Sequence, residues 1–248
     1  MPHKEFKRIV PHAETAVLLI HGVAGTPNHF DFLIPLIPED VSVYNMLLDG
    51  HGKGVRDFAN TSMKKWESQV RAAVSELTET HDRVYIAAHS MGTLFAIEQA
   101  VENQKVEKLF LMAAPLKLFL KPSMVSYSTK VYLDKIDEKD PRAVAAKHCY
   151  GITGSRNPLP YLGWIPRYLE LFDKIRRTRR LLPVLRTSCM VCQSCQDELV
   201  AICSQKLFVN MQNVTCMPLA DSSHYYYPPK DRQQLMNAFA VFFGFIKQ

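Results

Sequence analysis

A serine that could act as a nucleophile stands directly after an apolar run. Residues 83–88 are rich in strand-forming types, and they lead into His89-Ser90-Met91-Gly92 and then into a helical pattern. A serine hydroxyl is a poor nucleophile at its ordinary pKa, so nucleophilic chemistry would also require a histidine as general base and a carboxylate to orient it. The alternative is that Ser90 is an ordinary loop serine.

The five residues Ala88-His89-Ser90-Met91-Gly92 resemble the nucleophile elbow Gly-x-Ser-x-Gly of the α/β-hydrolase family. Small residues two positions before and after the serine let a tight turn bring backbone segments together while the hydroxyl stays accessible. The chain departs from the pattern at Ala88, where glycine is expected, although a methyl group is the smallest possible addition. The resemblance implies an α/β-hydrolase fold, in which a mostly parallel sheet is flanked by helices.

The resemblance also implies that the acid, and then the histidine, follow the nucleophile along the chain. Two histidines follow Ser90, namely His148 and His224. His148 falls in a segment without a convincing strand, whereas His224 follows the last expected strand, where the family has its catalytic loop. We therefore predict that His224 is the general base.

The acid is expected after the preceding strand. Asp197 lies in Ser194-Cys-Gln-Asp-Glu-Leu-Val200, which resembles the family's acid turn, where an aspartate stands three residues before a valine. We predict that Asp197 orients the base. Glu198, next to it, and Asp221, in the histidine's own loop, are the alternatives.

A glycine-containing loop follows the first expected strand, with the sequence His21-Gly22-Val23-Ala24-Gly25-Thr26-Pro27. It resembles the His-Gly-x-x-Gly-Thr/Ser-Pro loop of esterases and monoglyceride lipases of the family. This likeness implies an oxyanion hole formed by the backbone N–H groups of Val23 and Met91. His21 is expected to hold the loop rather than to act as a base.

Three neighbours of these residues are predicted to bind substrate, namely Gly22, His89 and Tyr225. Tyr225 begins an aromatic run, 225–227, that either lines the mouth of a pocket or packs inside the protein. A further stretch, 49–52, resembles the Gly-His-Gly loop of the family, for which we expect an architectural role.

The elements that must position these residues follow an alternating pattern. Helical spacings separate short strand-like runs, which predicts a mostly parallel sheet covered by helices. The expected strands are residues 16–20, 41–48, 83–88, 108–113, 187–192 and 214–218. Between residues 115 and 185 there are several prolines, helix-like segments and no convincing strand. We therefore predict an α/β-hydrolase core, 1–114 and 186–248, with an inserted helical cap, 115–185.

The expected cap contains a basic cluster within residues 169–182. Its members are Lys174, Arg176, Arg177, Arg179 and Arg180. Apolar residues at helical spacing accompany them, which predicts an amphipathic helix with a solvated basic face. A weak contact with an anionic membrane surface or an acidic partner is the alternative.

The composition limits the protein class. The chain has 248 residues, 47% hydrophobic and 22% charged, which suits one large globular domain or a domain with an insertion and excludes a disordered or coiled-coil protein. The formal charge of +6 is modest and scattered, so we expect no nucleic-acid partner.

The N-terminal residues are charged, and the longest apolar run near the C-terminus, 238–246, is too short to span a bilayer. We expect a cytoplasmic protein.

Three cysteines are spaced like metal ligands, at Cys189, Cys192 and Cys195. If residues 187–192 form a strand, Cys189 and Cys192 point to opposite faces and cannot hold one ion. We therefore expect no metal site and no cofactor, and we interpret these cysteines as small buried apolar residues. A redox-sensitive pair of Cys192 and Cys195 is the alternative.

Together these features predict hydrolysis of carboxylic esters through an acyl-enzyme. The resemblance implies a small-molecule substrate, either a short- or medium-chain acyl ester or a monoglyceride. Thioester hydrolysis or peptidase action with the same residues is an alternative, as is a binding protein that has lost catalysis. The sequence predicts no oligomeric state.

Overall fold

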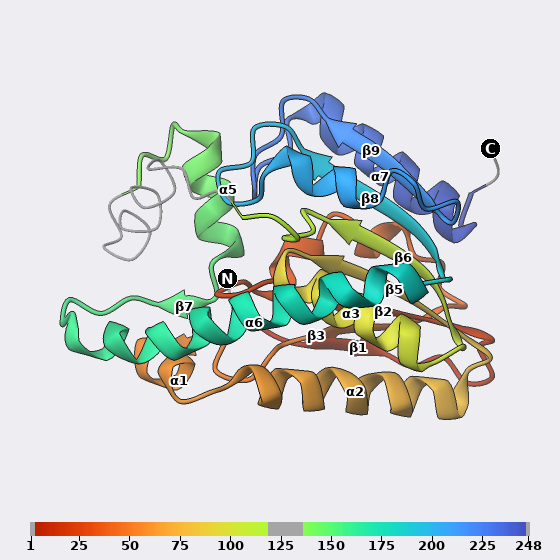
Figure 1. Ribbon diagram of the computed structural model, residues 1–248, viewed down its shortest axis with the longest axis horizontal. Coiled ribbons are helices and arrows are strands. Elements are labelled where there is room, and N and C mark those ends of the chain that lie inside the picture. The colour runs from red at the N-terminus through yellow and green to blue at the C-terminus, as the bar shows by residue number, and fades with distance from the viewer. Residues whose placement is uncertain (1–2, 119–135, 247–248) are drawn as a thin grey trace.

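A seven-stranded sheet forms the centre of the computed structural model, which describes residues 3–118 and 136–246 (Figure 1). In spatial order the strands are β1 (Phe6–Arg8), β3 (Ser42–Met46), β2 (Thr15–Ile20), β5 (Arg83–His89), β6 (Val106–Met112), β8 (Ser188–Ser194) and β9 (Val214–Leu219). All neighbours are parallel except β1, which pairs antiparallel with β3 at one edge. The predicted α/β fold is therefore confirmed.

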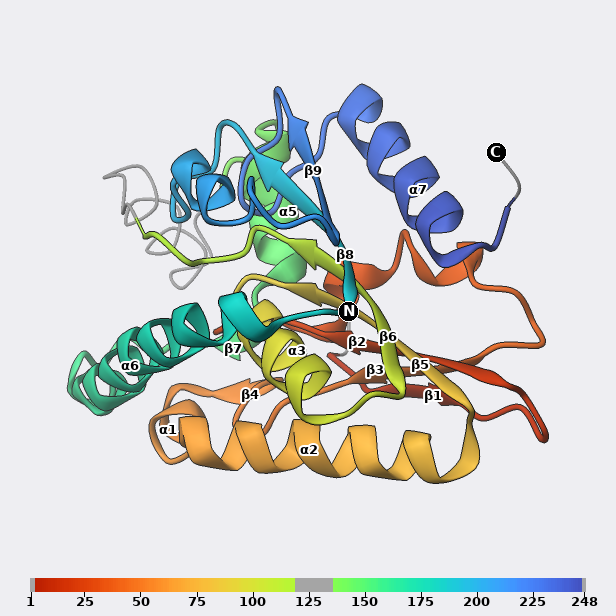
Figure 2. The ribbon, with the colours of Figure 1, turned by 45° about the vertical axis from the view of Figure 1, so that its right-hand side comes forward.

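Helices cover both faces of the sheet. The α-helices are α1 (Val55–Ala59), α2 (Met63–Thr80), α3 (Met91–Glu102), α5 (Pro141–Cys149), α6 (Ile165–Leu181) and α7 (Pro229–Phe243). The 3₁₀ helices are η1 (Pro27–Phe30), η2 (Ile34–Leu36), η3 (Leu159–Trp164), η4 (Leu182–Val184) and η5 (Ile202–Leu207). Figure 2 shows α7 on one face and α2, α3 and α6 on the other.

The side-chain alternation of the central strands explains the two layers. Leu18 and Ile86 pack with α2 and α3, whereas Val17 and Tyr85 point to the opposite face and pack with α7. Because successive side chains of a strand face opposite sides, a strand buried on both faces is an unbroken apolar run. This is why the six expected strands are present at or within a few residues of their predicted positions.

Three short strands were not predicted from the sequence. Edge strand β1 is largely exposed and polar, so it carries no apolar run. The two-residue strands β4 (Lys53–Gly54) and β7 (Ile152–Thr153) pair in parallel as a separate small sheet. Two residues are too few to show an alternation of apolar and polar side chains. Strand β7 corrects the expectation that residues 115–185 contain no strand.

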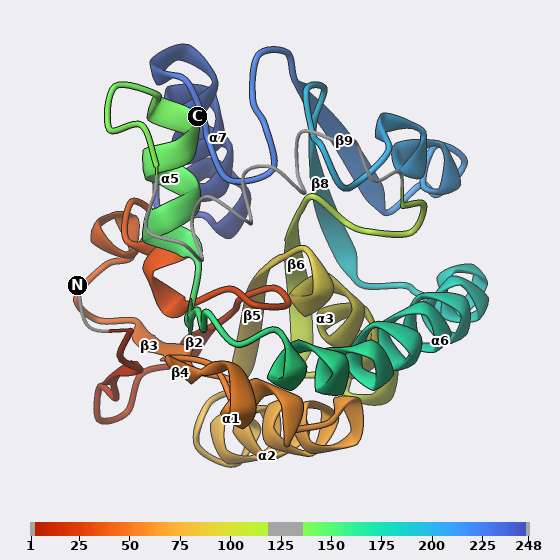
Figure 3. The same ribbon diagram turned by 90° about the vertical axis from the view of Figure 1, so that its left-hand side faces the viewer.

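The chain between β6 and β8 packs against the helices and loops of the sheet domain. In this segment α5 contacts η1, and α6 contacts α2 and α3, as Figure 3 also shows. Part of the predicted cap, residues 119–135, lies outside the described residues. The division into a core and an inserted cap stays a prediction.

The basic cluster on α6 is only partly solvated, which corrects the sequence interpretation. Lys174 is 1% exposed, and its ammonium forms ion pairs with Glu98 on α3 and with Glu67 on α2, the latter at 2.9 Å. The ammonium also lies 5.0 Å from the ring centroid of Phe95. Lys174 therefore joins α6 to two helices of the sheet domain. Arg180, by contrast, is exposed.

We expect Lys174→Met to lower the free energy of unfolding by about 2–3 kcal/mol. Removing one partner of a fully buried ion pair costs about 3–5 kcal/mol of stability, because the remaining charge is uncompensated. The expected loss is smaller here because the two glutamates retain some contact with water. Urea unfolding of the variant measures the change. Arg180→Met is the matched control, for which we expect a change below about 0.5 kcal/mol. Equal effects of the two substitutions would show that the buried ion pairs do not anchor α6.

Candidate active site

Ser90 occupies a strained turn between β5 and α3. Its φ of 51° and ψ of −124° are rarely adopted by a residue other than glycine. The turn is fixed on both sides, because the Ser90 N–H donates to the Met112 carbonyl at 2.9 Å and the Thr93 hydroxyl donates to the Ser90 carbonyl at 2.7 Å. This is the strand-turn-helix geometry that the sequence predicted around Ser90.

Two glycines let other backbone segments approach this turn closely. A Cβ atom on Gly92 would lie 2.2 Å from the Ile20 carbonyl oxygen, so no side chain fits there. A Cβ atom on Gly22 would lie 2.8 Å from the Ser90 Cβ. Gly22 therefore places the predicted oxyanion loop directly against Ser90.

Asp197 and His224 form a buried pair. The carboxylate Oδ2 accepts a hydrogen bond from His224 Nδ1 at 2.8 Å, and each side chain is 1% exposed. The other oxygen, Oδ1, accepts the backbone N–H groups of Leu199 and Val200, both at 2.8 Å. These donors fix the carboxylate and, through it, the imidazole. His224 Nε2 has no hydrogen-bond partner among the residues that the structure describes, so it is available to accept a proton.

The rival acids do not contact the imidazole ring. The Glu198 carboxylate accepts the backbone N–H of His224 at 3.0 Å, so it supports the loop rather than the ring. Asp221 is exposed, and its backbone N–H donates to Asp231. The other downstream histidine, His148, pairs instead with Asp31 at 3.1 Å.

Two histidines hold the predicted oxyanion loop. His21 Nε2 accepts the N–H of Leu48 at 3.1 Å, and its Nδ1 donates to the Gly22 carbonyl at 2.9 Å. His51 Nε2 accepts the N–H of Ala24, also at 3.1 Å. This arrangement agrees with an architectural role for both histidines. Val23 lies between the anchored residues 22 and 24, and Met91 begins α3 directly after Ser90.

His89 and Tyr225, predicted to bind substrate, both contact the histidine loop. His89 Nε2 donates to the His224 carbonyl at 3.0 Å, and the His89 ring stacks on His29 with a centroid distance of 3.8 Å. The Tyr225 ring lies 4.7 Å from the His224 ring. His89 is buried among these protein groups, so its observed contacts are with the loop. Substrate contacts of Gly22, His89 and Tyr225 stay predictions.

Sequence reasoning missed the role of His29. Its Nε2 lies 3.3 Å from the Tyr227 hydroxyl, so His29 and His89 together link η1, the serine turn and the 224–227 loop. His29 follows the recognisable oxyanion motif by only two positions. No spacing in the sequence, however, indicates that it stacks on a residue sixty positions later.

Burial keeps four histidines around the site neutral. Desolvation lowers the pKa of His29 to about 3 and of His51 to about 4. It also lowers the pKa of His21 and of His89 well below the usual value. Each ring therefore carries one donor nitrogen and one acceptor nitrogen at neutral pH.

These pKa shifts predict that the protein loses stability in mild acid. The four histidines bind a proton in the unfolded chain below about pH 6.5 but stay neutral when folded, so the unfolded state gains protons first. Each is expected to remove roughly 1.4 kcal/mol of stability per pH unit below its unfolded pKa, until its own folded pKa is reached. Urea midpoints at pH 8.5, 7.5 and 5.5 test this. We expect the midpoint to change little between pH 8.5 and 7.5 and to fall markedly between pH 7.5 and 5.5. A midpoint that is unchanged or higher at pH 5.5 would contradict the claim that the four histidines are buried in the neutral form.

The cysteines whose spacing resembles that of metal ligands are divided between the two faces of the sheet. Cys189 packs in the layer with α2 and α3, and Cys192 packs in the layer with α7, as strand alternation predicted. All six cysteines of the chain are free thiols.

In the described ranges, no helix has both the length and the apolar character needed to cross a bilayer.

Comparison with known proteins identifies the family. The Alpha/beta hydrolase family matches residues 17–231, and the chain belongs to this family. A search of curated proteins finds no match.

Solved structures share the fold at low sequence identity. One structure, reported with the metagenome-derived lipolytic enzymes LipS and LipT, has a TM-score of 0.71 at 18% identity, with 98% of each chain covered. The monoacylglycerol lipase of Paleococcus ferrophilus has a TM-score of 0.65 at 18% identity, with 96% of each chain covered. The thioesterase domain from the curacin biosynthetic pathway has a TM-score of 0.60 at 14% identity, covering 95% of this chain and 98% of its own.

Proposed function

We propose that this protein is a serine hydrolase that cleaves carboxylic esters through an acyl-enzyme, with Ser90, Asp197 and His224 as its catalytic residues. The buried 2.8 Å hydrogen bond between Asp197 and His224 carries the proposal, because it leaves the outer imidazole nitrogen free to accept a proton. The strained turn at Ser90 and its close approach to Gly22 support it further.

The reaction follows from these positions. The Ser90 hydroxyl attacks the ester carbonyl while His224 Nε2 takes its proton, and Asp197 stabilises the imidazolium. The backbone N–H groups of Val23 and Met91 stabilise the oxyanion. Collapse of the tetrahedral intermediate releases the alcohol, which takes the proton from His224. Water then attacks the acyl-enzyme with His224 again as base, and the acid leaves as Ser90 regains its proton.

We propose short- or medium-chain acyl esters or monoglycerides as the substrates. The similarity to lipolytic enzymes and to a monoacylglycerol lipase supports an ester. The similarity to a thioesterase domain makes a thioester the second candidate. No cofactor takes part in the proposed mechanism.

A panel of p-nitrophenyl esters of increasing acyl length, with matched acyl thioesters and a peptide amide, tests the substrate class. We expect the esters to be hydrolysed with the highest kcat/KM. Turnover confined to thioesters would replace the first candidate by the second. Turnover confined to the peptide would point to a peptidase, and no turnover of any of the three would favour a non-catalytic binding protein.

We further propose that His89 is a positioning residue, since it holds the His224 carbonyl and stacks on His29. His89→Ala is expected to lower kcat by about tenfold to a hundredfold with little change in KM, because small misplacement of a catalytic group is costly. His89→Gln, which keeps an N–H donor, is expected to recover part of the loss. Steady-state kinetics on one p-nitrophenyl ester compares the two; a loss confined to KM would instead assign His89 a substrate contact.

A cytoplasmic location and a weak membrane contact through α6 remain proposals from the sequence. Apolar side chains, Leu162, Ile165 and Leu169, are exposed on η3 and α6. Together with exposed Arg180, they support an amphipathic surface, although burial of Lys174 removes one cation from it.

A further inference from the structure

Residues 22–25, at the centre of the predicted oxyanion loop, form a strained β-turn. The N–H of Gly25 donates to the Gly22 carbonyl at 3.1 Å, which closes the turn. Ala24 has a φ of 53°, and Val23 does not share this positive φ, which is the pattern of a type II turn. Glycine or asparagine usually occupies the position of Ala24, because a left-handed backbone is strained for other residues. The turn that contains the proposed oxyanion donor Val23 therefore needs stabilising contacts from outside itself.

Two groups bond the backbone of Ala24 from outside the turn. The N–H of Ala24 donates to His51 Nε2 at 3.1 Å, and its carbonyl accepts the N–H of Gly151 at 2.8 Å. The Gly151 carbonyl in turn accepts the N–H of Gly52 at 2.6 Å. Ala24 is buried, so loss of either partner would leave a polar group unpaired, at a cost of about 1–3 kcal/mol. The two bonds therefore stabilise the left-handed backbone of Ala24.

The absence of a side chain at Gly151 lets it reach the turn. Its φ is not positive, so its own backbone conformation does not require glycine. A Cβ atom at this position, however, would lie 2.2 Å from the Gly25 carbonyl oxygen and 3.2 Å from the Thr26 Cβ. Any side chain would therefore push Gly151 away from the turn and weaken its hydrogen bond to Ala24.

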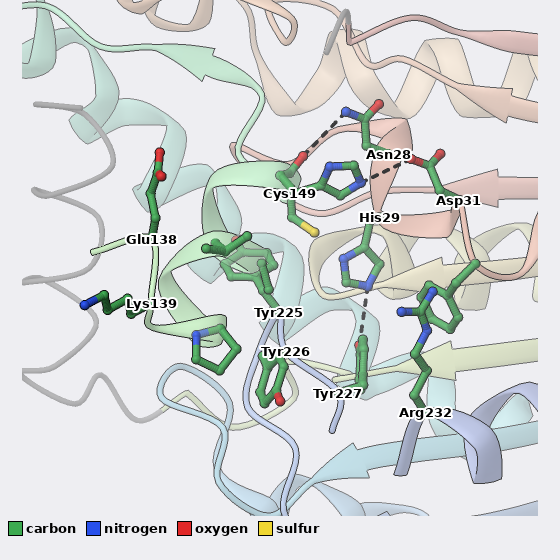
Figure 4. A pocket seen from close by; sticks show the side chains of 15 residues that line it. Asn28, His29, Asp31, Glu138, Lys139, Cys149, Tyr225, Tyr226, Tyr227 and Arg232 are labelled. Carbon is green, nitrogen blue, oxygen red and sulfur yellow. Dashed lines mark hydrogen bonds and ion pairs between the residues drawn. The ribbon is translucent and has the colours of Figure 1, made fainter. Parts of the chain in front are cut away.

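Gly151 lies in an anchored stretch between α5 and β7. Ile152, the next residue, is 5% exposed and packs in the core layer with α2 and α3. At the end of α5, the Asn28 side-chain amide donates to the His148 carbonyl at 3.5 Å, and the His148 ring lies 3.1 Å from the Asp31 carboxylate. Figure 4 shows both contacts as dashed lines. These contacts on either side hold Gly151 against the turn.

We propose that Gly151 is a positioning residue for the oxyanion hole. Its N–H holds turn 22–25 in the conformation that presents the N–H of Val23 to the oxyanion, so it acts through Ala24 and does not touch substrate. The inference rests on the proposed function. It adds a contribution from the chain between β6 and β8, which contains none of the proposed catalytic residues.

Gly151→Ala tests the proposal by steady-state kinetics on a p-nitrophenyl ester. Oxyanion donors act mainly in the transition state, and loss of one costs roughly a hundredfold to a thousandfold in kcat. For a misplaced donor we expect kcat to fall by about tenfold to a hundredfold, with little change in KM.

Gly163→Ala is the matched control, because Gly163 is also a crowded glycine between β6 and β8. A Cβ atom there would lie 2.7 Å from the Ala59 Cβ, so the substitution crowds α1 instead of turn 22–25. It is expected to keep the wild-type kcat. Equal losses of kcat in Gly163→Ala and Gly151→Ala would show a general effect of crowding and overturn the proposal.

A thionoester of the same acid and alcohol separates positioning from a general loss of structure. Sulfur replaces the carbonyl oxygen, and because sulfur is a weak hydrogen-bond acceptor, an oxyanion hole favours the oxygen ester. We expect the wild type to prefer the ester by about tenfold or more in kcat/KM, and Gly151→Ala to reduce this preference by about threefold or more. Both substrates are measured on one preparation, so the ratio does not depend on the folded fraction. An unchanged ratio would overturn the proposal.

Ile152→Val is a second variant that loosens the same stretch without adding an atom. Such a substitution typically costs about 0.5–1.5 kcal/mol of stability, so the fold is expected to persist. We expect a smaller reduction of the ester preference, in the same direction. If Gly151→Ala does not fold, an ester preference in Ile152→Val equal to that of the wild type would overturn the proposal.

The same measurements separate this inference from the proposed function. Absence of ester turnover by the wild type would overturn the proposed function and, with it, the role of Gly151. Ester turnover by the wild type, with kcat and ester preference unchanged in Gly151→Ala and Ile152→Val, would overturn the role of Gly151 alone.

Discussion

Replacement of Ser90 by alanine is expected to lower kcat for the best p-nitrophenyl ester by roughly 10⁶, because the other site groups then have no nucleophile to activate. The fold should persist, since the backbone bonds that hold the turn, to Met112 and from Thr93, end on Ser90 main-chain atoms. The measurement is steady-state turnover of purified wild type and variant.

Ser188→Ala is the matched control for this experiment, because Ser188 is an exposed serine at the start of β8. It is expected to retain wild-type turnover. Residual activity of Ser90→Ala above about one per cent, with circular dichroism unchanged, would mean that another group performs the attack.

Asp197→Asn carries the second-largest expected effect, a fall in kcat of about 10⁴. The amide retains the shape of the carboxylate, but it loses the charge that stabilises the imidazolium and holds His224 with its proton on Nδ1. The 2.8 Å contact between Asp197 and His224 is the reason for assigning this effect to Asp197.

Glu198→Gln is the discriminating control, because Glu198 is adjacent to Asp197 and its carboxylate accepts the backbone N–H of His224 rather than a ring N–H. Its amide oxygen still accepts that bond, so we expect a loss of no more than about tenfold. If Glu198→Gln were the more damaging of the two substitutions, the acid would have to be reassigned.

The positions of the sheet and of the serine turn could be predicted from local sequence. Strand β5 is an apolar run that ends at Ser90, and small residues flank the serine for a steric reason that the Gly92 contact with Ile20 makes explicit. Asp197 and His224 each follow an expected strand, in the order that the family resemblance implies. Parallel strands bring their carboxyl ends to one edge, so such residues meet although they are far apart in sequence.

The parts that could not be predicted depend on partners from distant elements. Helical spacing predicts a solvated face for Lys174, because it does not reveal that Glu67 and Glu98 meet this side chain from two other helices. The stacking of His29 on His89 likewise results from how η1 packs against the end of β5. Strand β7 consists of two residues and has no pattern to detect.

The central claim is that Ser90 is an activated nucleophile, and covalent labelling by a fluorophosphonate tests it most directly. Intact-protein mass spectrometry should show one phosphonyl group per chain, and peptide mapping should place it on Ser90. Ser90→Ala should take up no label, and His224→Ala should react much more slowly. Labelling that persists in Ser90→Ala, or wild-type protein that stays unlabelled under conditions that label a control esterase, would contradict the claim.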